Sequence, residues 1–209
     1  MGVNTRKYHG LLIAAFNPPT DRRVLLSKLD EEVHVGEGTY QLGANESRKG
    51  VQPEGYRFLS GFSLSPFPKF TYQVNSVRLN KSVFMPTEKN ATIVIYEVTS
   101  PDAEKAFVRI TPSLNSRHFH SVTEKEKLQW NFTQKLFEKG VIFQPSAPLS
   151  ALVLSSTEGR YIVGKGEWIE TYFRADGSRG ENCLEHVYQP GFFEAEIAPN
   201  ESKRFCILA

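Results

Sequence analysis

The sequence has few cysteines, no long apolar run and almost no excess charge. Its two cysteines among 209 residues, Cys183 and Cys206, lie far apart and cannot form the disulfide framework of a small secreted domain. No segment approaches the ~20 apolar residues that a spanning helix needs. The polar N-terminus also lacks the layout of a signal peptide. We therefore expect a cytoplasmic protein with two ordinary thiols and no membrane partner.

The charges are nearly balanced, with 25 basic and 23 acidic residues and a formal net charge of +2. Proteins that bind nucleic acid or an anionic membrane usually show a basic excess, because contacts to phosphate supply much of the affinity. The composition therefore predicts no nucleic-acid partner.

The common catalytic signatures are also missing. The sequence has no Gly-x-Ser-x-Gly elbow, no Gly-rich phosphate loop and no His-Glu-x-x-His zinc helix. Two cysteines cannot make a four-ligand zinc site without histidines. His118 and His120 would share one face of a strand and could share a metal, but surface polar groups are the commoner interpretation of such a pair. We expect no cofactor and no metal.

What the sequence does have is aromatic residues and short strand-like runs. It contains 15 Phe, 8 Tyr and 2 Trp, and aromatic side chains favour strands. Apolar runs recur at short intervals with Gly, Pro, Asn and Ser between them, which is typical of a sandwich or barrel. The predicted strands are 7–16, 23–35, 68–74, 77–85, 91–98, 106–114, 128–133, 141–144, 151–155, 160–163, 192–197 and 203–208. We expect one all-β domain over residues 1–209.

Four segments carry more specific expectations. Asn75-Ser76 is predicted to turn a hairpin. The apolar run Ile93–Tyr96 suits a strand buried on both faces. Residues 36–67 form either a binding loop or a hairpin with weak strands, and loops this long are often functional. Residues 166–172 form a short helix or an irregular strand.

Candidate sugar contacts rest on residue type alone. Glycoside hydrolysis needs two facing carboxylates, but the adjacent Glu31 and Glu32 would point to opposite faces of a strand. Trp130 and Trp168 lie among polar residues and are candidate sugar platforms, with burial in the core as the alternative. Arginine offers a fixed fork of donors, although a solvated arginine is the default. The candidate arginines are Arg6, Arg117, Arg174 and Arg179.

The residues at the start of the chain resemble a known family. The block NTRKYHGLL at 4–12, followed by NPP at 17–19 and RVLLSKLDE at 23–31, is similar to the signature of bacterial and archaeal glycogen-debranching enzymes of the amylo-α-1,6-glucosidase type. Shorter blocks continue the resemblance in order along the chain. These are FPKFTY at 67–72, KSVFMP at 81–86, NSRHFH at 115–120, RGE at 179–181 and PGFF at 190–193.

The resemblance implies an arrangement of domains. In this family a β-supersandwich, similar to galactose-mutarotase-like domains, precedes an (α/α)6 barrel that holds the acid and base and hydrolyses α-1,6 branch points of glycogen. This chain would then contain the β-domain without the barrel. It would have no catalytic residue, would be inactive alone, and would have the barrel and α-glucan (glycogen or maltooligosaccharide) as its partners.

The resemblance is incomplete in three places. Family members usually carry a strand and a Gly-rich turn before the block at 4–12, so a trimmed or truncated start is expected. They also tend to have an acidic residue where His118 stands. The stretch 173–182 is looser than usual around Arg179.

The block at 4–12 allows two physical roles. As a strand over residues 7–16, it would place Arg6, Tyr8 and Gly10 on one face and Lys7, His9 and Leu11 on the other. Its edge could face the barrel and shape the sugar cleft, or Arg6, Tyr8 and His9 could lock the sandwich by buried hydrogen bonds. The candidate contacts for carbohydrate or the domain interface are Asn4, Arg6, Tyr8, His9, Arg117, His120, Trp130, Trp168 and Arg179.

Two further functions remain as alternatives. A freestanding carbohydrate-binding β-sandwich would bind maltooligosaccharides as an isolated chain. A mutarotase-like epimerase would need acid–base chemistry by histidine and carboxylate, and only the likeness of fold favours it.

Overall fold

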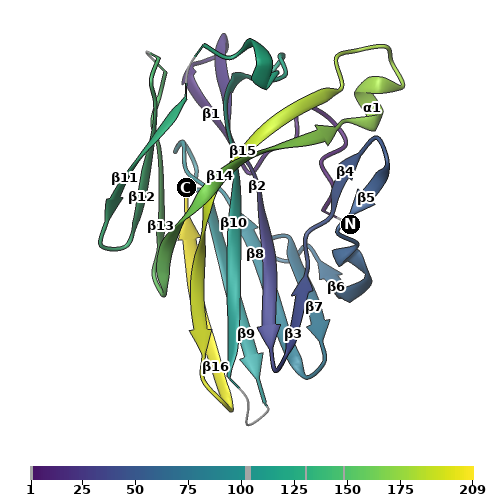
Figure 1. Cartoon of the computed structure of the whole chain (residues 1–209), viewed down its shortest axis with the longest axis vertical. Coiled ribbons are helices and arrows are strands. Elements are labelled where there is room, and N and C mark those ends of the chain that lie inside the picture. The colour runs from purple at the N-terminus through teal and green to yellow at the C-terminus, as the bar shows by residue number, and fades with distance from the viewer. Residues whose placement is uncertain (1, 102–104, 130, 148) are drawn as a thin grey trace.

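The computed structural model describes residues 2–101, 105–129, 131–147 and 149–209, and within them the chain is almost entirely antiparallel β-structure (Figure 1). Two large sheets face each other. The prediction of an all-β sandwich is confirmed, while the finer likeness to galactose-mutarotase-like domains stays a prediction.

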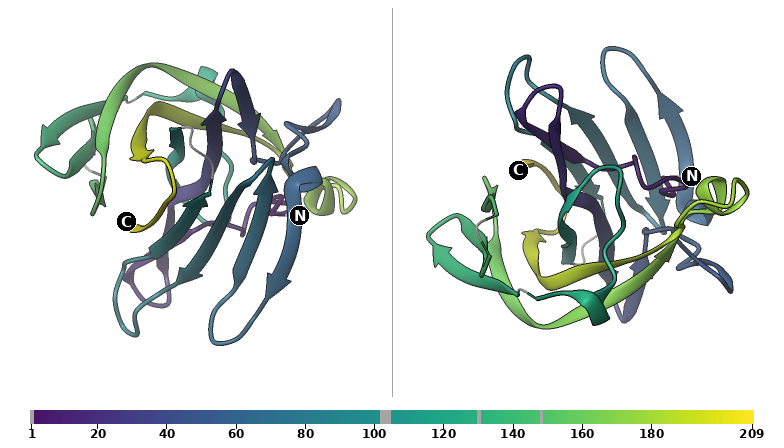
Figure 2. Two further views of the ribbon diagram at one scale, coloured as in Figure 1. Left: turned by 90° about the horizontal axis from the view of Figure 1, so that it is seen from below. Right: turned by 90° about the horizontal axis from the view of Figure 1, so that it is seen from above.

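The first sheet, sheet A, has 6 strands in the order β1-β2-β10-β15-β14, with β3 also paired to β2. Its strands are β1 (Leu12–Asn17), β2 (Asp21–Val35), β3 (Gly38–Gln41), β10 (Ala106–His118), β14 (Arg160–Tyr172) and β15 (Leu184–Ile197). Figure 2 views the molecule from its two ends and shows β14 curving along its outside.

The second sheet, sheet C, has 8 strands in the order β11-β12-β13-β16-β9-β8-β7-β6. Its strands are β6 (Leu59–Ser63), β7 (Lys69–Val74), β8 (Val77–Phe84), β9 (Ile93–Ser100), β11 (Phe132–Phe137), β12 (Gly140–Pro145), β13 (Leu152–Ser156) and β16 (Glu201–Leu208).

Small elements decorate one end of this frame. A hairpin of β4 (Asn45–Ser47) and β5 (Gly50–Gln52) lies beside the short helix α1 (Arg174–Gly177) in Figure 1. Two 3-10 turns, η1 (Gly55–Phe58) and η2 (Lys125–Lys127), complete the described elements. No helix in the described part of the chain is long and apolar enough to cross a membrane.

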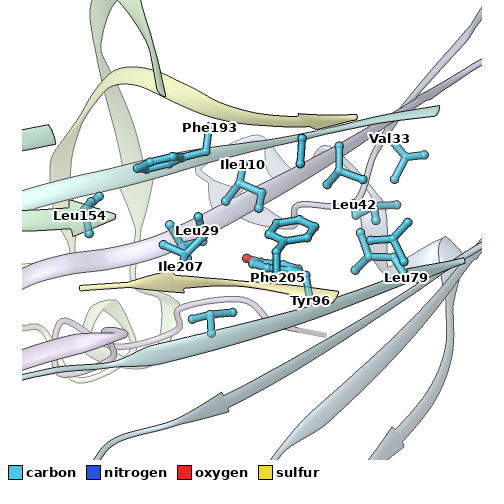
Figure 3. Packing of buried hydrophobic residues seen from close by; sticks show 14 of the residues in the cluster. Leu29, Val33, Leu42, Leu79, Tyr96, Ile110, Leu154, Phe193, Phe205 and Ile207 are labelled. Atoms are coloured by element: carbon cyan, nitrogen blue, oxygen red, sulfur yellow. The ribbon is translucent and has the colours of Figure 1, made fainter. Parts of the chain in front are cut away.

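The core lies between the two sheets (Figure 3). Leu29, Ile110 and Phe193 enter from sheet A, and Tyr96 and Phe205 enter from sheet C with their rings stacked at 5.2 Å. Side chains alternate along the strands, so in a strand such as β9 one face is buried in the core and the other is more exposed.

A polar cluster crosses this core. Glu31 of β2 is 3% exposed, and its carboxylate lies 2.6 Å from the ammonium of Lys81 on β8 and accepts a 2.6 Å hydrogen bond from the hydroxyl of Tyr96 on β9. Lys81 also donates to the carbonyl of Leu29 at 3.0 Å. Burial and the neighbouring Glu31 carboxylate raise the pKa of Tyr96 well above its usual range. These three side chains therefore join the two sheets by hydrogen bonds and charge.

Several sequence predictions are confirmed by the elements. Asn75 turns the β7–β8 hairpin with a φ of 50°, in the left-handed region that asparagine tolerates. Glu31 and Glu32 point to opposite faces of β2, as expected. The segment 36–67 resolves into short strands and the 3-10 turn η1, and the segment 166–172 belongs to β14 beyond a register shift.

Two predictions are wrong in their details. The run at 93–96 is buried on one face only: Val94 and Tyr96 are buried, while Ile93 and Ile95 remain partly exposed. Only the inner face of sheet C packs against sheet A. The apolar composition of a strand does not distinguish burial on one face from burial on both faces. The first strand begins at Leu12 rather than Lys7, because the polar residues before Leu12 form a turn.

Candidate functional site

The block at 4–12 forms a turn that precedes the first strand. The backbone N–H of His9 donates to the carbonyl of Arg6 at 3.0 Å, and the N–H of Thr5 donates to Nδ1 of His9 at 3.2 Å. The predicted alternation of Arg6, Tyr8 and Gly10 along a strand is therefore wrong. The strand begins with the apolar residues from Leu12 onward, and the polar residues before them form the turn.

A buried arginine holds this turn in place. The Arg117 guanidinium, at the end of β10, donates to both carboxylate oxygens of Glu185 on β15 and, at 2.7 Å, to the carbonyl of Lys7. Arg117 is 5% exposed and Glu185 is 1% exposed. Arg117 is thus largely enclosed and bound to protein groups, and its predicted contact with a sugar or a domain interface stays a prediction.

The carboxylate of Glu185 is the centre of a wider network. It accepts a hydrogen bond from the backbone N–H of Thr123 at 3.2 Å, and the hydroxyl of Thr123 donates to Asn115 at 2.6 Å. Burial raises the pKa of Glu185, and the Arg117 guanidinium acts in the opposite direction. The network ties β10, β15 and the N-terminal turn into one unit.

A second set of contacts fixes the same turn from the side of α1. The backbone N–H of Lys7 donates to the buried carboxylate of Asp176 at 2.6 Å, and its ammonium lies 2.6 Å from Glu181. The hydrogen bond between the Lys7 ammonium and the Glu181 carboxylate raises the pKa of Lys7 and lowers the pKa of Glu181. Locking by buried hydrogen bonds therefore does occur, but Lys7 and Arg117 supply it rather than Arg6, Tyr8 or His9.

Tyr8 and His120 meet at the surface. The Tyr8 hydroxyl lies 3.1 Å from Nδ1 of His120, and its ring contacts Phe119 edge-on at 5.6 Å. The structure thus brings together two predicted residues that are far apart in sequence. His118 packs against His120 at 5.3 Å. Within the described residues no group of three or more His, Cys, Asp or Glu side chains could hold a metal ion.

Three predicted residues line one hollow of about 390 Å³, which we call the motif hollow. Asn4, Tyr8 and His9 form one wall, and Phe70, Lys81 and Val83 of β7 and β8 form another. Asn4 also donates to the carbonyl of Ser27 at 3.1 Å. The motif hollow lies between the N-terminal turn and sheet C.

The other predicted residues lie elsewhere. Arg179 is exposed and Arg6 is half-buried. Trp168 is half-buried and packs its ring against Tyr188 at 5.2 Å, and Tyr188 itself packs against the core. The prediction for Trp130 lies outside the described residues. The carbohydrate roles of these residues stay predictions.

A second hollow lies on the outer face of sheet A, under the β4–β5 hairpin. This hairpin hollow has a volume of about 310 Å³. Its floor comes from β2, β10, β14 and β15, and its roof from the hairpin. The principal side chains around it are Asp30, Asn45, Glu46, Thr111, Ile169 and Gln189.

Most residues of the hairpin hollow carry no functional signal in the sequence. One signal was available, since Lys28, Asp30, Glu32 and His34 alternate with buried neighbours along β2 and so predict a polar outer face. Nothing local, however, could place the hairpin above that face. The pairing of Arg174 with Glu46 at 3.0 Å is a contact between positions far apart in the chain.

Comparisons with known proteins give one family. The family model described as "Glycogen debranching enzyme N terminal" matches residues 1–204. No curated protein matches the sequence. Among solved structures, a bacterial glucoamylase complexed with acarbose matches 100% of the chain at 12% identity with a TM-score of 0.46. The chain spans 31% of the length of that structure.

Proposed function

The chain belongs to the glycogen debranching enzyme N-terminal family, and from that premise we propose that it is a non-catalytic domain that packs on a catalytic (α/α)6 barrel. The parent enzyme would be a cytoplasmic amylo-α-1,6-glucosidase. The domain would present the barrel with an apolar surface and would also contact the α-glucan.

The observation that carries the proposal is a group of exposed apolar side chains at the β6 edge of sheet C. Phe62, Leu64, Phe67 and Met85 are 54%, 67%, 43% and 50% exposed. Phe84 stacks on Phe67 at 4.8 Å, and we call these five side chains, which come from β6, β8 and the residues just outside β6, β7 and β8, the aromatic edge. Large apolar side chains gathered on a surface commonly mark an interface with a protein.

The aromatic edge continues into the motif hollow. Phe70 contacts Phe62 at a ring distance of 4.9 Å and also lines the motif hollow beside Tyr8 and His9. Phe70 therefore links Phe62 of the aromatic edge to the N-terminal block. This contact supports the hypothesis that the block faces the barrel.

The buried Glu185 carboxylate is not a candidate general acid. A general acid in glycoside hydrolysis combines a raised pKa with access to the glycosidic oxygen. Burial raises the pKa of Glu185, but this side chain is enclosed and bound to Arg117. It therefore cannot reach a substrate.

The proposal is tested by association. We expect the chain to co-purify with the separately produced catalytic barrel, and the double change Phe62→Ser and Phe67→Ser to abolish the complex. The matched control is Leu136→Ser with Phe137→Ser, also exposed but on β11 at the opposite edge of sheet C.

The control pair should leave the complex intact, and the isolated chain should release no sugar from branched dextrin. Equal loss of the complex in both pairs, or hydrolysis by the chain alone, would contradict the proposal.

A further inference from the structure

We propose that the hairpin hollow is a binding site for a neutral glucose unit of the α-glucan. This inference rests on the proposed function for the class of ligand, and on the geometry of the hollow for its place. At about 310 Å³ the hollow is at the lower end of the range of small-molecule sites, ~300–1,000 Å³. That size suits a single sugar unit better than a long stretch of glucan.

The floor of the hollow is polar and faces outward from sheet A. Thr111 of β10 lies opposite Asp30 of β2 in the strand register, so both side chains project from the same face. Gln189 of β15 adds an amide that donates to Ser113 at 3.0 Å. Ile169 of β14 supplies an apolar patch. Hydroxyl, amide and carboxylate groups around one aliphatic side chain match a sugar ring, which has a polar rim and apolar faces.

The polar groups are held in place before any ligand arrives. The Lys28 ammonium donates to the Asn45 side chain at 2.8 Å and lies 3.1 Å from Asp30, while the Asn45 amide donates to Asp30 at 2.8 Å. Glu46 is held by Arg174 of α1 at 3.0 Å. Fixed donors and acceptors lose little freedom on binding, which favours affinity.

An unpartnered hydroxyl lies in a small neighbouring hollow. This second hollow, of about 20 Å³, shares Asn45, Glu46 and Gln189 with the hairpin hollow and is also lined by Ser27. Ser27 is 5% exposed, and its hydroxyl has no hydrogen-bond partner among the described residues. Buried polar groups are normally satisfied, so this hydroxyl is available to a polar ligand or to water.

The charges around the hollow select against other ligands. The hollow is lined by the carboxylates of Asp30, Glu32, Glu46 and Glu170, which would repel an anion such as a phosphate. Asp30 and Glu46 each have a cation beside them, Lys28 and Arg174 respectively, and no group of three or more His, Cys, Asp or Glu side chains among the described residues could hold a metal ion. A neutral ligand with hydroxyl groups, which both donate and accept, fits this lining.

The motif hollow is the less suitable sugar site. Val3, Leu11, Phe70 and Val83 make much of its lining apolar, and it adjoins the aromatic edge. We therefore assign the motif hollow to protein contact and the hairpin hollow to sugar.

The experiment is calorimetric titration of the 209-residue chain with maltotriose. Wild type should bind saturably, and Thr111→Phe, which fills the hollow from its floor, should weaken binding at least ~10-fold. The matched control is Thr99→Phe, an exposed position on sheet C. A second control, His9→Ala, alters the motif hollow. Both controls should bind as wild type, and thermal unfolding should show that all variants are folded.

Three outcomes would overturn the inference: no saturable binding by wild type, unchanged binding by Thr111→Phe, or a loss confined to His9→Ala. None of these three outcomes bears on the association of the chain with the barrel, which is measured separately. A failure of this inference is therefore distinguishable from a failure of the proposed docking role.

Discussion

At the scale of single residues, Arg117 has a structural role that its neighbours in the sequence do not indicate. In sequence it lies within NSRHFH, where a fork of donors suggests ligand binding. In the fold it is 5% exposed and satisfies a carboxylate and a carbonyl from two other segments. A buried ion pair of this kind contributes little net stability when complete, but it is costly to break because the remaining charge loses its partner.

Arg117→Ala should destabilise the domain by about 3–5 kcal/mol, since it leaves the Glu185 carboxylate buried without its cation. Urea unfolding measures the change. The matched control is Arg179→Ala at an exposed position, where we expect a change within about 0.5 kcal/mol. Equal effects of the two substitutions would show that Arg117 does not anchor the turn.

The Lys7–Glu181 pair should make a contribution to the free energy of unfolding that depends on pH. The hydrogen bond lowers the pKa of Glu181 in the folded state. A carboxyl group with a lowered folded-state pKa adds stability above its unfolded pKa, and this stability is lost as the pH falls through the folded value.

We therefore expect Glu181→Gln to be less stable than wild type at about pH 7, and the difference to shrink between about pH 5 and pH 3. Denaturant unfolding at several pH values measures the free energies. A difference that stays constant over this range would exclude the pair as its cause.

At the scale of elements, the β4–β5 hairpin is the least predictable part of the fold. Its strands have three residues each, so neither periodicity nor propensity could identify them. The position of the hairpin depends on a close backbone contact between the segments on either side of it. The N–H of Gly55, after β5, donates to the carbonyl of Gly43, before β4, at 2.9 Å. A Cβ at Gly55 would lie 2.1 Å from the carbonyl oxygen of Leu42.

Gly55→Ala should therefore displace η1 and the hairpin, at a cost of about 1–3 kcal/mol typical of overpacking. If the hairpin roofs the sugar site, the same change should weaken maltotriose binding. Gly61→Ala is the control, because a Cβ there would lie 3.6 Å from Thr71, at an ordinary contact distance. Thermal unfolding and calorimetry of both variants give the comparison, and a Gly55→Ala variant as stable as wild type would contradict the packing argument.

At the scale of the whole molecule, the two sheets are joined by more than apolar contact. Glu31 belongs to sheet A, and Lys81 and Tyr96 belong to sheet C, so the buried cluster also constrains how the sheets can slide past each other. A charged pair inside a sandwich is not needed for burial. The pair favours one alignment of the two sheets, because an alignment that separates Glu31 from Lys81 would leave a buried charge without its partner.

Lys81→Met should destabilise the domain by about 3–5 kcal/mol, because it leaves Glu31 without its cation, and the double change Lys81→Met with Glu31→Leu should recover most of that loss. A double-mutant cycle by denaturant unfolding measures the coupling between the two positions. Additive effects of the two single changes would show that the pair acts as two independent charges.

The sequence by itself determined the class of fold, because strand periodicity, turn residues and aromatic content are local properties. It also determined the family, since the blocks at 4–12 and beyond occur in order. It could place Asp30 and Glu32 on the outer face of β2, since alternation follows from the geometry of a strand.

Only the tertiary structure decided which polar residues meet. The turn at residues 4–12 depends on Arg117 and Asp176, which come from β10 and from the helix α1 more than 100 positions later. The hairpin hollow exists because long-range pairing brings β2, β10, β15 and β14 side by side beneath the hairpin. Burial and pairing between distant segments set the charge, access and position of a side chain, and no local pattern carries that information.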